Sequence, residues 1–174
     1  GFRNLYENFN YMAERIDVLV SRELKQQILI NQANFKHLQA QINPHFMYNT
    51  LECIRGMALY HEEKEIAKLT GSLSKLFRYN VKGEELVSVK EVVKNLKEYA
   101  LIIDYRFMGK FKVVIEAEES LLQVFLPKML VQPLVENAVL HGLEPKMDRG
   151  EVNVCFAEEQ EENMCITVRD DGCG

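Results

Sequence analysis

Hydrophobic residues recur every three or four positions through the first forty residues, which is typical of one long helix with a heptad seam. The seam slips by one residue near position 20, and no glycine or proline interrupts it between Phe2 and Asn43. The slip suggests two helical modules joined end to end, and the narrow stripe predicts a partner helix, most simply from a second copy of the chain. The seam consists of Phe2, Leu5, Phe9, Met12, Ile16, Leu19, Val20, Leu24, Ile28, Asn31, Phe35, Leu38 and Ile42.

Asn43-Pro44 ends this pattern, because proline cannot donate a helical hydrogen bond and restricts the residue before it. A second helix is expected from about Pro44 to Tyr60, with Pro44 in its first turn. A third is expected over residues 63–79. Two such antiparallel helices form a hairpin, and two hairpins make a four-helix bundle. The apolar face predicted for the third helix is Ile66, Leu69, Leu73 and Leu76.

Strand and helix patterns alternate after Lys82-Gly83. Ser88 and Glu91 form a capping-box signature at the start of a helix. Strands are expected over 86–89, 111–116, 151–157 and 164–170. Between the second and third of these, Pro127 and Pro133 predict a helical turn and then a helix that runs to His141 and is stopped by Gly142. The helix behind Ser88 should bury Val92, Leu96, Tyr99, Ile103 and Phe107.

Composition limits the class of protein. The 174 residues carry a net charge of −5, and 47% are hydrophobic, which fits one ordinary folded domain or two small ones. The acidic balance argues against general nucleic-acid binding. No stretch is apolar enough to cross a bilayer, and the first residues do not form a signal peptide. The four cysteines show no zinc-ligand spacing and are expected to be reduced thiols.

His45 is the first candidate for chemistry. On a helix, His45, Asn49 and Glu52 lie opposite an apolar sector formed by Met47, Leu51, Ile54 and Ala58. A neutral imidazole is a competent nucleophile near pH 7. Taken alone, this spacing favours an ordinary surface histidine near a helix kink.

The segment from Leu38 to Leu51, LQAQINPHFMYNTL, closely resembles the phosphoacceptor box of sensor histidine kinases of the LytS/YesM type. The resemblance implies that His45 accepts the γ-phosphoryl group of ATP and passes it to an aspartate of a response regulator. Asn49 would help to orient this transfer or to remove phosphate from the regulator. Phe46 stands where the more familiar kinases carry an acid, so the resemblance leaves the proton acceptor for His45 open.

Residues 126–142, LPKMLVQPLVENAVLHG, contain a second match. Asn137 and His141 are four residues apart and share a helix face, and an amide oxygen suits Mg²⁺, although a surface polar patch would look the same. The segment resembles the N-box of the gyrase, Hsp90, kinase and MutL ATPase superfamily. The resemblance implies that Asn137 helps to hold Mg²⁺ and that His141 lies at the nucleotide.

The final motif, Asp170-Asp171-Gly172-Cys173-Gly174, resembles the first glycine box of the same superfamily. The resemblance implies that Asp170 receives the adenine amino group and that Gly172 and Gly174 let the backbone approach the nucleotide. Asp171 replaces the usual asparagine of the kinases. Hydrolysing members carry a glutamate four residues before the N-box asparagine, and Pro133 at that place favours phosphoryl transfer over hydrolysis.

We therefore expect an α+β protein in three parts. Residues 1–20 resemble the last helix of a HAMP relay module, which implies an upstream transmembrane sensor and places this portion in the cytoplasm of a bacterial cell. Residues 21–82 form a homodimeric phosphotransfer hairpin, and residues 83–174 form an incomplete ATP-binding α/β sandwich that lacks its lid and second glycine box. The expected function is ATP·Mg²⁺-dependent autophosphorylation followed by transfer to a receiver domain, with this chain alone nearly inactive. A non-catalytic dimeric scaffold and an ATP-hydrolysing machine are the alternatives.

Overall fold

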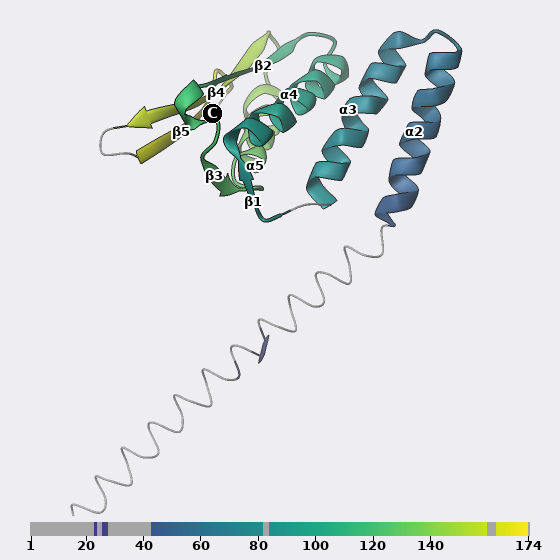
Figure 1. Cartoon of the computed structure of the whole chain (residues 1–174). Helices are drawn as coiled ribbons and strands as arrows, with labels where there is room; N and C mark the ends of the chain where they lie inside the picture. The colour runs from purple at the N-terminus through teal and green to yellow at the C-terminus, as the bar shows by residue number, and fades with distance from the viewer. Residues whose placement is uncertain (1–22, 24–25, 28–42, 82–83, 160–162, 174) are drawn as a thin grey trace, which may run out of the picture. The chain divides into compact units, whose positions relative to one another are not determined.

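The computed structural model describes residues 23, 26–27, 43–81, 84–159 and 163–173 (Figure 1). By its internal contacts the chain divides into two compact units, residues 1–44 and 45–174. Glu23, Gln26 and Gln27 are helical, but the rest of the predicted first helix and its seam lies outside the described residues. The predicted domain boundaries near residues 20 and 82 also fall outside them, and they stay predictions.

Two helices form the expected hairpin. Helix α2 covers Pro44–Tyr60 and helix α3 covers Lys64–Val81, so α2 begins at the predicted proline. The two helices pack through Tyr48, which is 7% exposed and meets the Phe77 ring edge to face, with ring centroids 5.5 Å apart. The Arg78 guanidinium lies 5.6 Å from the centroid of the same tyrosine ring.

The predicted apolar faces of this hairpin are only partly buried. On α2, Leu51 and Ala58 are buried, but Met47 and Ile54 are 37% and 42% exposed. On α3 the small residues Ala67, Thr70 and Ser74 are buried, while Ile66 and Leu73 lie outside. Of the predicted α3 face, Leu76 is buried and Leu69 is half-buried. We call the exposed set the outer apolar surface: Phe46, Met47, Ile54, Met57, Ile66 and Leu73.

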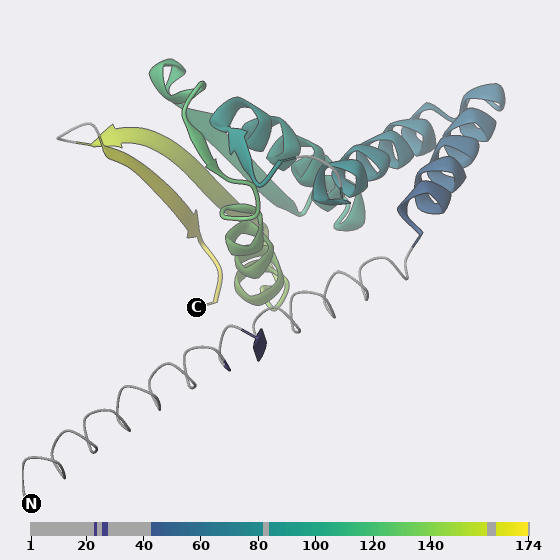
Figure 2. The same cartoon turned by 60° about the horizontal axis from the view of Figure 1, so that its bottom comes forward.

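The second half is a mixed domain built on two small sheets (Figures 1 and 2). Strands β1 (Leu86–Ser88) and β3 (Phe125–Pro127) pair antiparallel. The other sheet has the order β2-β4-β5, in which β2 is parallel to β4 and β4 is antiparallel to β5. Its strands are β2 (Phe111–Ala117), β4 (Gly150–Glu159) and β5 (Asn163–Asp170). Helix α4 (Val89–Arg106) contacts β2, and a single-turn 3₁₀ helix covers Glu119–Leu121.

The core of this domain follows the predicted periodicities. Helix α4 begins at Ser88 and Glu91, which form the predicted capping box. Alternate residues of β4 are almost fully buried, as expected for a strand with one face on the core. Three of them, Val152, Val154 and Phe156, share the core with Val92, Leu96 and Ile103 of α4. The α+β class is confirmed.

Two features between residues 119 and 143 differ from the predictions. Strand β3, which ends at Pro127, was not predicted; its register places Leu126 opposite Val87. The expected turn follows it, with the Leu130 N–H donating to the Pro127 carbonyl at 3.1 Å. Gly142 does not end its helix: α5 (Gln132–Asn137) continues as a π-helical segment, Ala138–Leu143. Both differences depend on contacts with distant parts of the chain, which local patterns do not contain.

Polar contacts join α3 to α4. Glu98 of α4 accepts hydrogen bonds from Ser72 Oγ at 2.6 Å and from Lys75 Nζ at 2.7 Å. Burial raises the pKa of the Glu98 carboxyl, but these hydrogen bonds and the charges of Lys75 and Lys94 outweigh it, so the pKa is lowered overall. Near the C-terminal end of α3, Tyr79 Oη donates to the Lys128 carbonyl at 3.4 Å.

Among the described residues, no helix is long and apolar enough to span a bilayer.

Candidate functional site

His45 lies exposed in the first turn of α2, beside Asn49 one turn later. The Asn49 Nδ2 and His45 Nδ1 atoms are 3.4 Å apart. The buried ring of Tyr48 anchors this turn to α3, and Thr50 Oγ1 donates to the Phe46 carbonyl at 2.8 Å. The turn that carries the exposed His45 and Asn49 is thereby fixed on the hairpin.

The tautomer of the imidazole follows from the orientation of the Asn49 amide. In the described orientation Nδ2 donates to Nδ1, so the neutral ring carries its proton on Nε2. Rotating the amide by 180° puts Oδ1 in the same place. The ring then carries its proton on Nδ1 and its lone pair on Nε2. Only this second orientation presents a lone pair away from the Asn49 contact, because in the first the Nδ1 lone pair accepts the Asn49 bond.

Asn137 and His141, from the second motif, lie on one continuous helical segment and are both exposed. Asn137 is the last residue of α5, directly before the backbone widens into the π-helical turn that holds His141. Such π-helical turns are frequent at functional sites. The two residues were predicted to share one face of a regular helix, but the helical geometry changes between them.

The end of this segment meets the third motif. The Cys173 N–H donates to the Gly142 carbonyl at 3.0 Å, and the Gly172 N–H donates to Asp170 Oδ1 at 3.0 Å. A Cβ on Gly142 would overlap the Asp170 carboxylate, and a Cβ on Gly172 would overlap the Gly142 backbone. Both glycines are therefore required by close approach, and the two motifs form one compact group. Gly174 lies outside the described residues.

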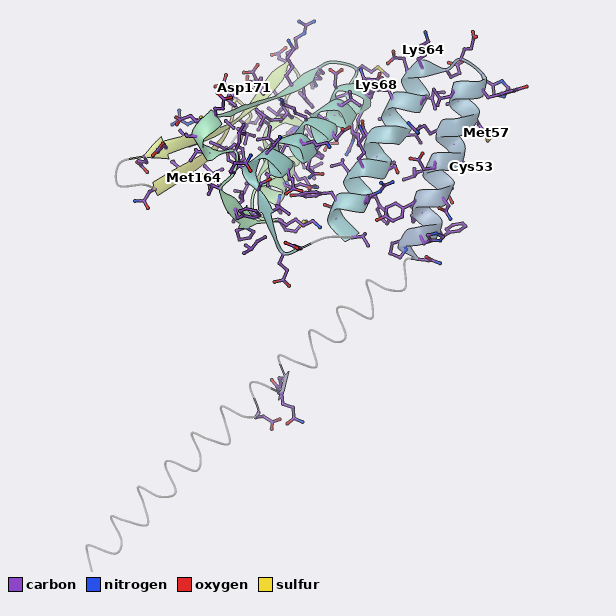
Figure 3. The ribbon with its side chains drawn as sticks, viewed as in Figure 1. Cys53, Met57, Lys64, Lys68, Met164 and Asp171 are labelled. Atoms are coloured by element: carbon purple, nitrogen blue, oxygen red, sulfur yellow. The ribbon has the colours of Figure 1, made fainter. Side chains whose placement is uncertain are left out.

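Asp171 closes this turn onto the start of β4. Its Oδ1 accepts the Glu151 N–H at 2.9 Å, and the Asp171 N–H donates to the Glu151 carbonyl at 3.2 Å. Lys146 Nζ lies 3.1 Å from Asp171 Oδ2 (Asp171 is labelled in Figure 3). The hydrogen bond from the Glu151 backbone, with the bond and charge of Lys146, lowers the pKa of Asp171. An asparagine could accept the same backbone bond, but it would not attract Lys146 by charge.

This donor set fits a magnesium nucleotide. Mg²⁺ in nucleotide sites is held by one or two protein oxygens, with phosphates and waters completing its octahedron. Asn137 offers one such oxygen, and no group of three or more His, Cys, Asp or Glu residues in the described part of the chain could form a separate metal site. Asp170 already accepts one backbone hydrogen bond, and its carboxylate can accept more, including one from an adenine amino group.

The structure thus gathers the predicted site residues into two groups. His45 and Asn49 form one group on α2, and Asp170 and Gly172 form another with the helical segment that carries Asn137 and His141. The sequence analysis missed the polar residues that support the second group. Lys146 has no motif of its own. Gln132 lies inside the N-box segment, but no pattern in the sequence distinguishes it from its neighbours. Its burial in the structure, where it is 5% exposed, does.

Comparison with known proteins agrees with the resemblance that the sequence motifs indicated. The family described as histidine kinase matches residues 33–111. The sensor histidine kinase YesM of Bacillus subtilis is 34% identical over 98% of this chain, which covers 30% of that protein. The sensor histidine kinase YpdA of Escherichia coli is 34% identical over 89% of the chain and 27% of its own length. The sensor protein LytS of B. subtilis is 33% identical over 94% of the chain and 28% of its own length.

These similarities run through the helical hairpin and the mixed domain alike. The chain belongs to the histidine kinase family, in the group of the YesM and LytS sensor kinases. It spans less than a third of the length of the curated relatives it matches.

Proposed function

We propose that this chain is the phosphoacceptor and nucleotide-binding portion of a sensor kinase that transfers the γ-phosphoryl group of ATP to His45 and then to an aspartate of a response regulator. The observation that carries the proposal is the exposed imidazole of His45 beside the Asn49 amide. The joined Gly142–Asp170–Gly172 group supplies the matching nucleotide half-site. Bound Mg²⁺ would neutralise phosphate charge.

The orientation of the Asn49 amide determines which ring nitrogen of His45 attacks the phosphorus. With Asn49 Oδ1 accepting from Nδ1–H, the Nε2 lone pair of His45 attacks the γ-phosphorus. The N–P bond forms, the bond to the β,γ-bridging oxygen breaks, and ADP is the leaving group. The Nδ1 proton stays on the ring. In the second step an aspartate oxygen forms the O–P bond, the N–P bond breaks, and neutral imidazole is the leaving group.

Hydrolysis by the usual superfamily mechanism has no base here. Pro133 occupies the place four residues before Asn137, and its side chain cannot accept a proton from water. Phosphoryl transfer depends mainly on positioning and charge stabilisation, and it needs no such base. This favours a kinase over an ATP-hydrolysing machine.

The outer apolar surface favours a homodimer. Met57 is 60% exposed and lies on the side of α2 away from α3 (Figure 3), and Phe46, Ile54, Ile66 and Leu73 are exposed on the same two helices. Contiguous apolar surface on a hairpin is a common sign of a protein interface. A second hairpin would complete a four-helix bundle.

We further propose that a HAMP module and a membrane-bound sensor lie upstream of this chain in the full-length protein.

Labelling with γ-labelled ATP tests the proposal. In the full-length protein we expect acid-labile label that is lost in His45→Gln and retained in His61→Gln. His61 is the matched control because it is an exposed histidine in the turn after α2. Undiminished label in His45→Gln would contradict the assignment. A wild-type protein that binds no nucleotide and gains no label would support the non-catalytic scaffold instead.

A further inference from the structure

A chain of buried polar side chains connects α4 to α5. Asn95 is 6% exposed and Gln132 is 5% exposed, and Asn95 Nδ2 donates to Gln132 Oε1 at 2.8 Å. Gln132 Nε2 in turn donates to Glu136 Oε1 at 2.7 Å. The flanking residues Leu96 and Val131 are fully buried, so the Asn95–Gln132 bond is shielded from water, while the bond to Glu136 is partly buried. In such surroundings an unmade hydrogen bond is costly, and a satisfied network fixes one geometry.

The spacing repeats one turn further along both helices. Tyr99 follows Asn95 by four residues on α4, as Glu136 follows Gln132 on α5, so each pair lies on one helix face. Burial and the charge of Glu136 raise the pKa of Tyr99 to about 12.

Helix α5 needs this support. It has only six residues before the backbone becomes π-helical, and Val131 provides no side-chain cap. Short helices are marginal by themselves, and their orientation comes from tertiary packing. The last residue of α5 is Asn137, which directly follows Glu136. Gln132 is the residue of α5 that bonds to α4, and its second bond, to Glu136, lies within α5. Fixing Gln132 on α4 therefore also fixes the short helix from which Asn137 projects.

We propose that Asn95 and Gln132 are positioning residues: their bond holds α5 on α4, the bond from Gln132 to Glu136 fixes the Gln132 amide, and together they set the direction of the Asn137 amide toward nucleotide-bound Mg²⁺. This inference rests on the proposed nucleotide site. Neither residue touches the nucleotide itself. Their loss should weaken binding of the magnesium complex specifically, whereas a loss of packing alone would weaken binding with and without the metal.

The test compares two variants of the full-length protein. In Gln132→Glu, Asn95 keeps its acceptor, but two carboxylates then face each other one turn apart. In the reciprocal swap, Gln132→Glu with Glu136→Gln, Asn95 still donates to residue 132, and the bond between residues 132 and 136 is restored with its direction reversed. ADP is titrated calorimetrically, once with Mg²⁺ and once with EDTA, and thermal unfolding reports stability.

We expect Gln132→Glu to weaken Mg·ADP binding about tenfold and to change metal-free ADP binding less than about twofold. The swap should return Mg·ADP affinity to within about threefold of wild type. Equal losses with and without Mg²⁺, or wild-type affinity in Gln132→Glu, would overturn the inference. If Gln132→Glu does not fold, the swap decides alone: a folded swap with weak Mg·ADP binding overturns it. A wild-type protein that binds no ADP would instead refute the proposed function.

Discussion

Replacing Gly142 with alanine adds one methyl group at the point where the π-helical turn meets the Asp170 turn. Its Cβ would lie 2.8 Å from Asp170 Cγ and 3.3 Å from Oδ2. Carbon atoms in contact normally lie about 3.5–4.0 Å apart. The carboxylate must therefore retreat by roughly 1 Å, and its hydrogen bond to the Gly172 N–H, now 3.0 Å long, would be strained or lost.

The cost can be bounded. Overpacking by one methyl group costs about 1–3 kcal/mol, and a factor of ten in affinity corresponds to about 1.4 kcal/mol. If the strain falls on the Asp170 turn, we expect nucleotide affinity to fall roughly 10–100-fold. Alanine itself suits the helical backbone of this segment, so the fold should survive. The loss would be local to the adenine end of the site.

Gly56→Ala is the matched control, because Gly56 lies in α2 and a Cβ there would meet nothing within 4 Å. It should leave ADP affinity unchanged and stabilise α2 by about 0.5–1 kcal/mol. The assay is calorimetric titration of both variants of the full-length protein with ADP. Wild-type affinity in a folded Gly142→Ala variant would show that the Asp170 carboxylate does not depend on this contact, and it would refute our account of the glycine.

Three further predictions concern other parts of the chain. Asn137→Ala should abolish Mg²⁺-dependent ADP binding without lowering the melting temperature, and a normal Mg·ADP titration would count against it. Asn49→Ala should slow autophosphorylation or regulator dephosphorylation, and unchanged rates of both would make Asn49 a plain surface amide. The lowered pKa of Glu98 means that its contribution to stability is present above the ordinary glutamate pKa of 4.5 and is lost as pH falls through the lowered value. Glu98→Gln should therefore reduce the acid dependence of unfolding, and an identical pH profile would contradict this.

The features that sequence reasoning identified are local ones. The capping box at Ser88, the start of α2 at Pro44 and the alternation along β4 each depend on residues within one turn or one strand. His45 and Asn49 belong to the same class, because four-residue spacing on a helix brings them together without help from elsewhere. The fold class followed from these local patterns.

The features that it missed depend on distant partners. Met47 and Ile54 are as apolar as Leu51, and only the position of α3 decides which of them is buried. Strand β3 has three residues and exists because β1 pairs with it. Gly142 looks like a helix stop, but its lack of a side chain serves the approach of Asp170. No periodicity in the sequence reports such contacts.

The same distinction applies to the two kinds of residue in the proposed nucleotide half-site. Residues that would meet the ligand, such as Asn137 and Asp170, stand in recognisable strings because the ligand constrains several neighbours at once. The residues that hold them are constrained only by their own partners. Asn95 and Gln132 are 37 positions apart, and either could be exchanged if its partner changed too. The reciprocal swap at residues 132 and 136 uses this freedom. Its success would mean that the geometry of α5, and not the identity of any one side chain on it, determines how Asn137 meets the metal.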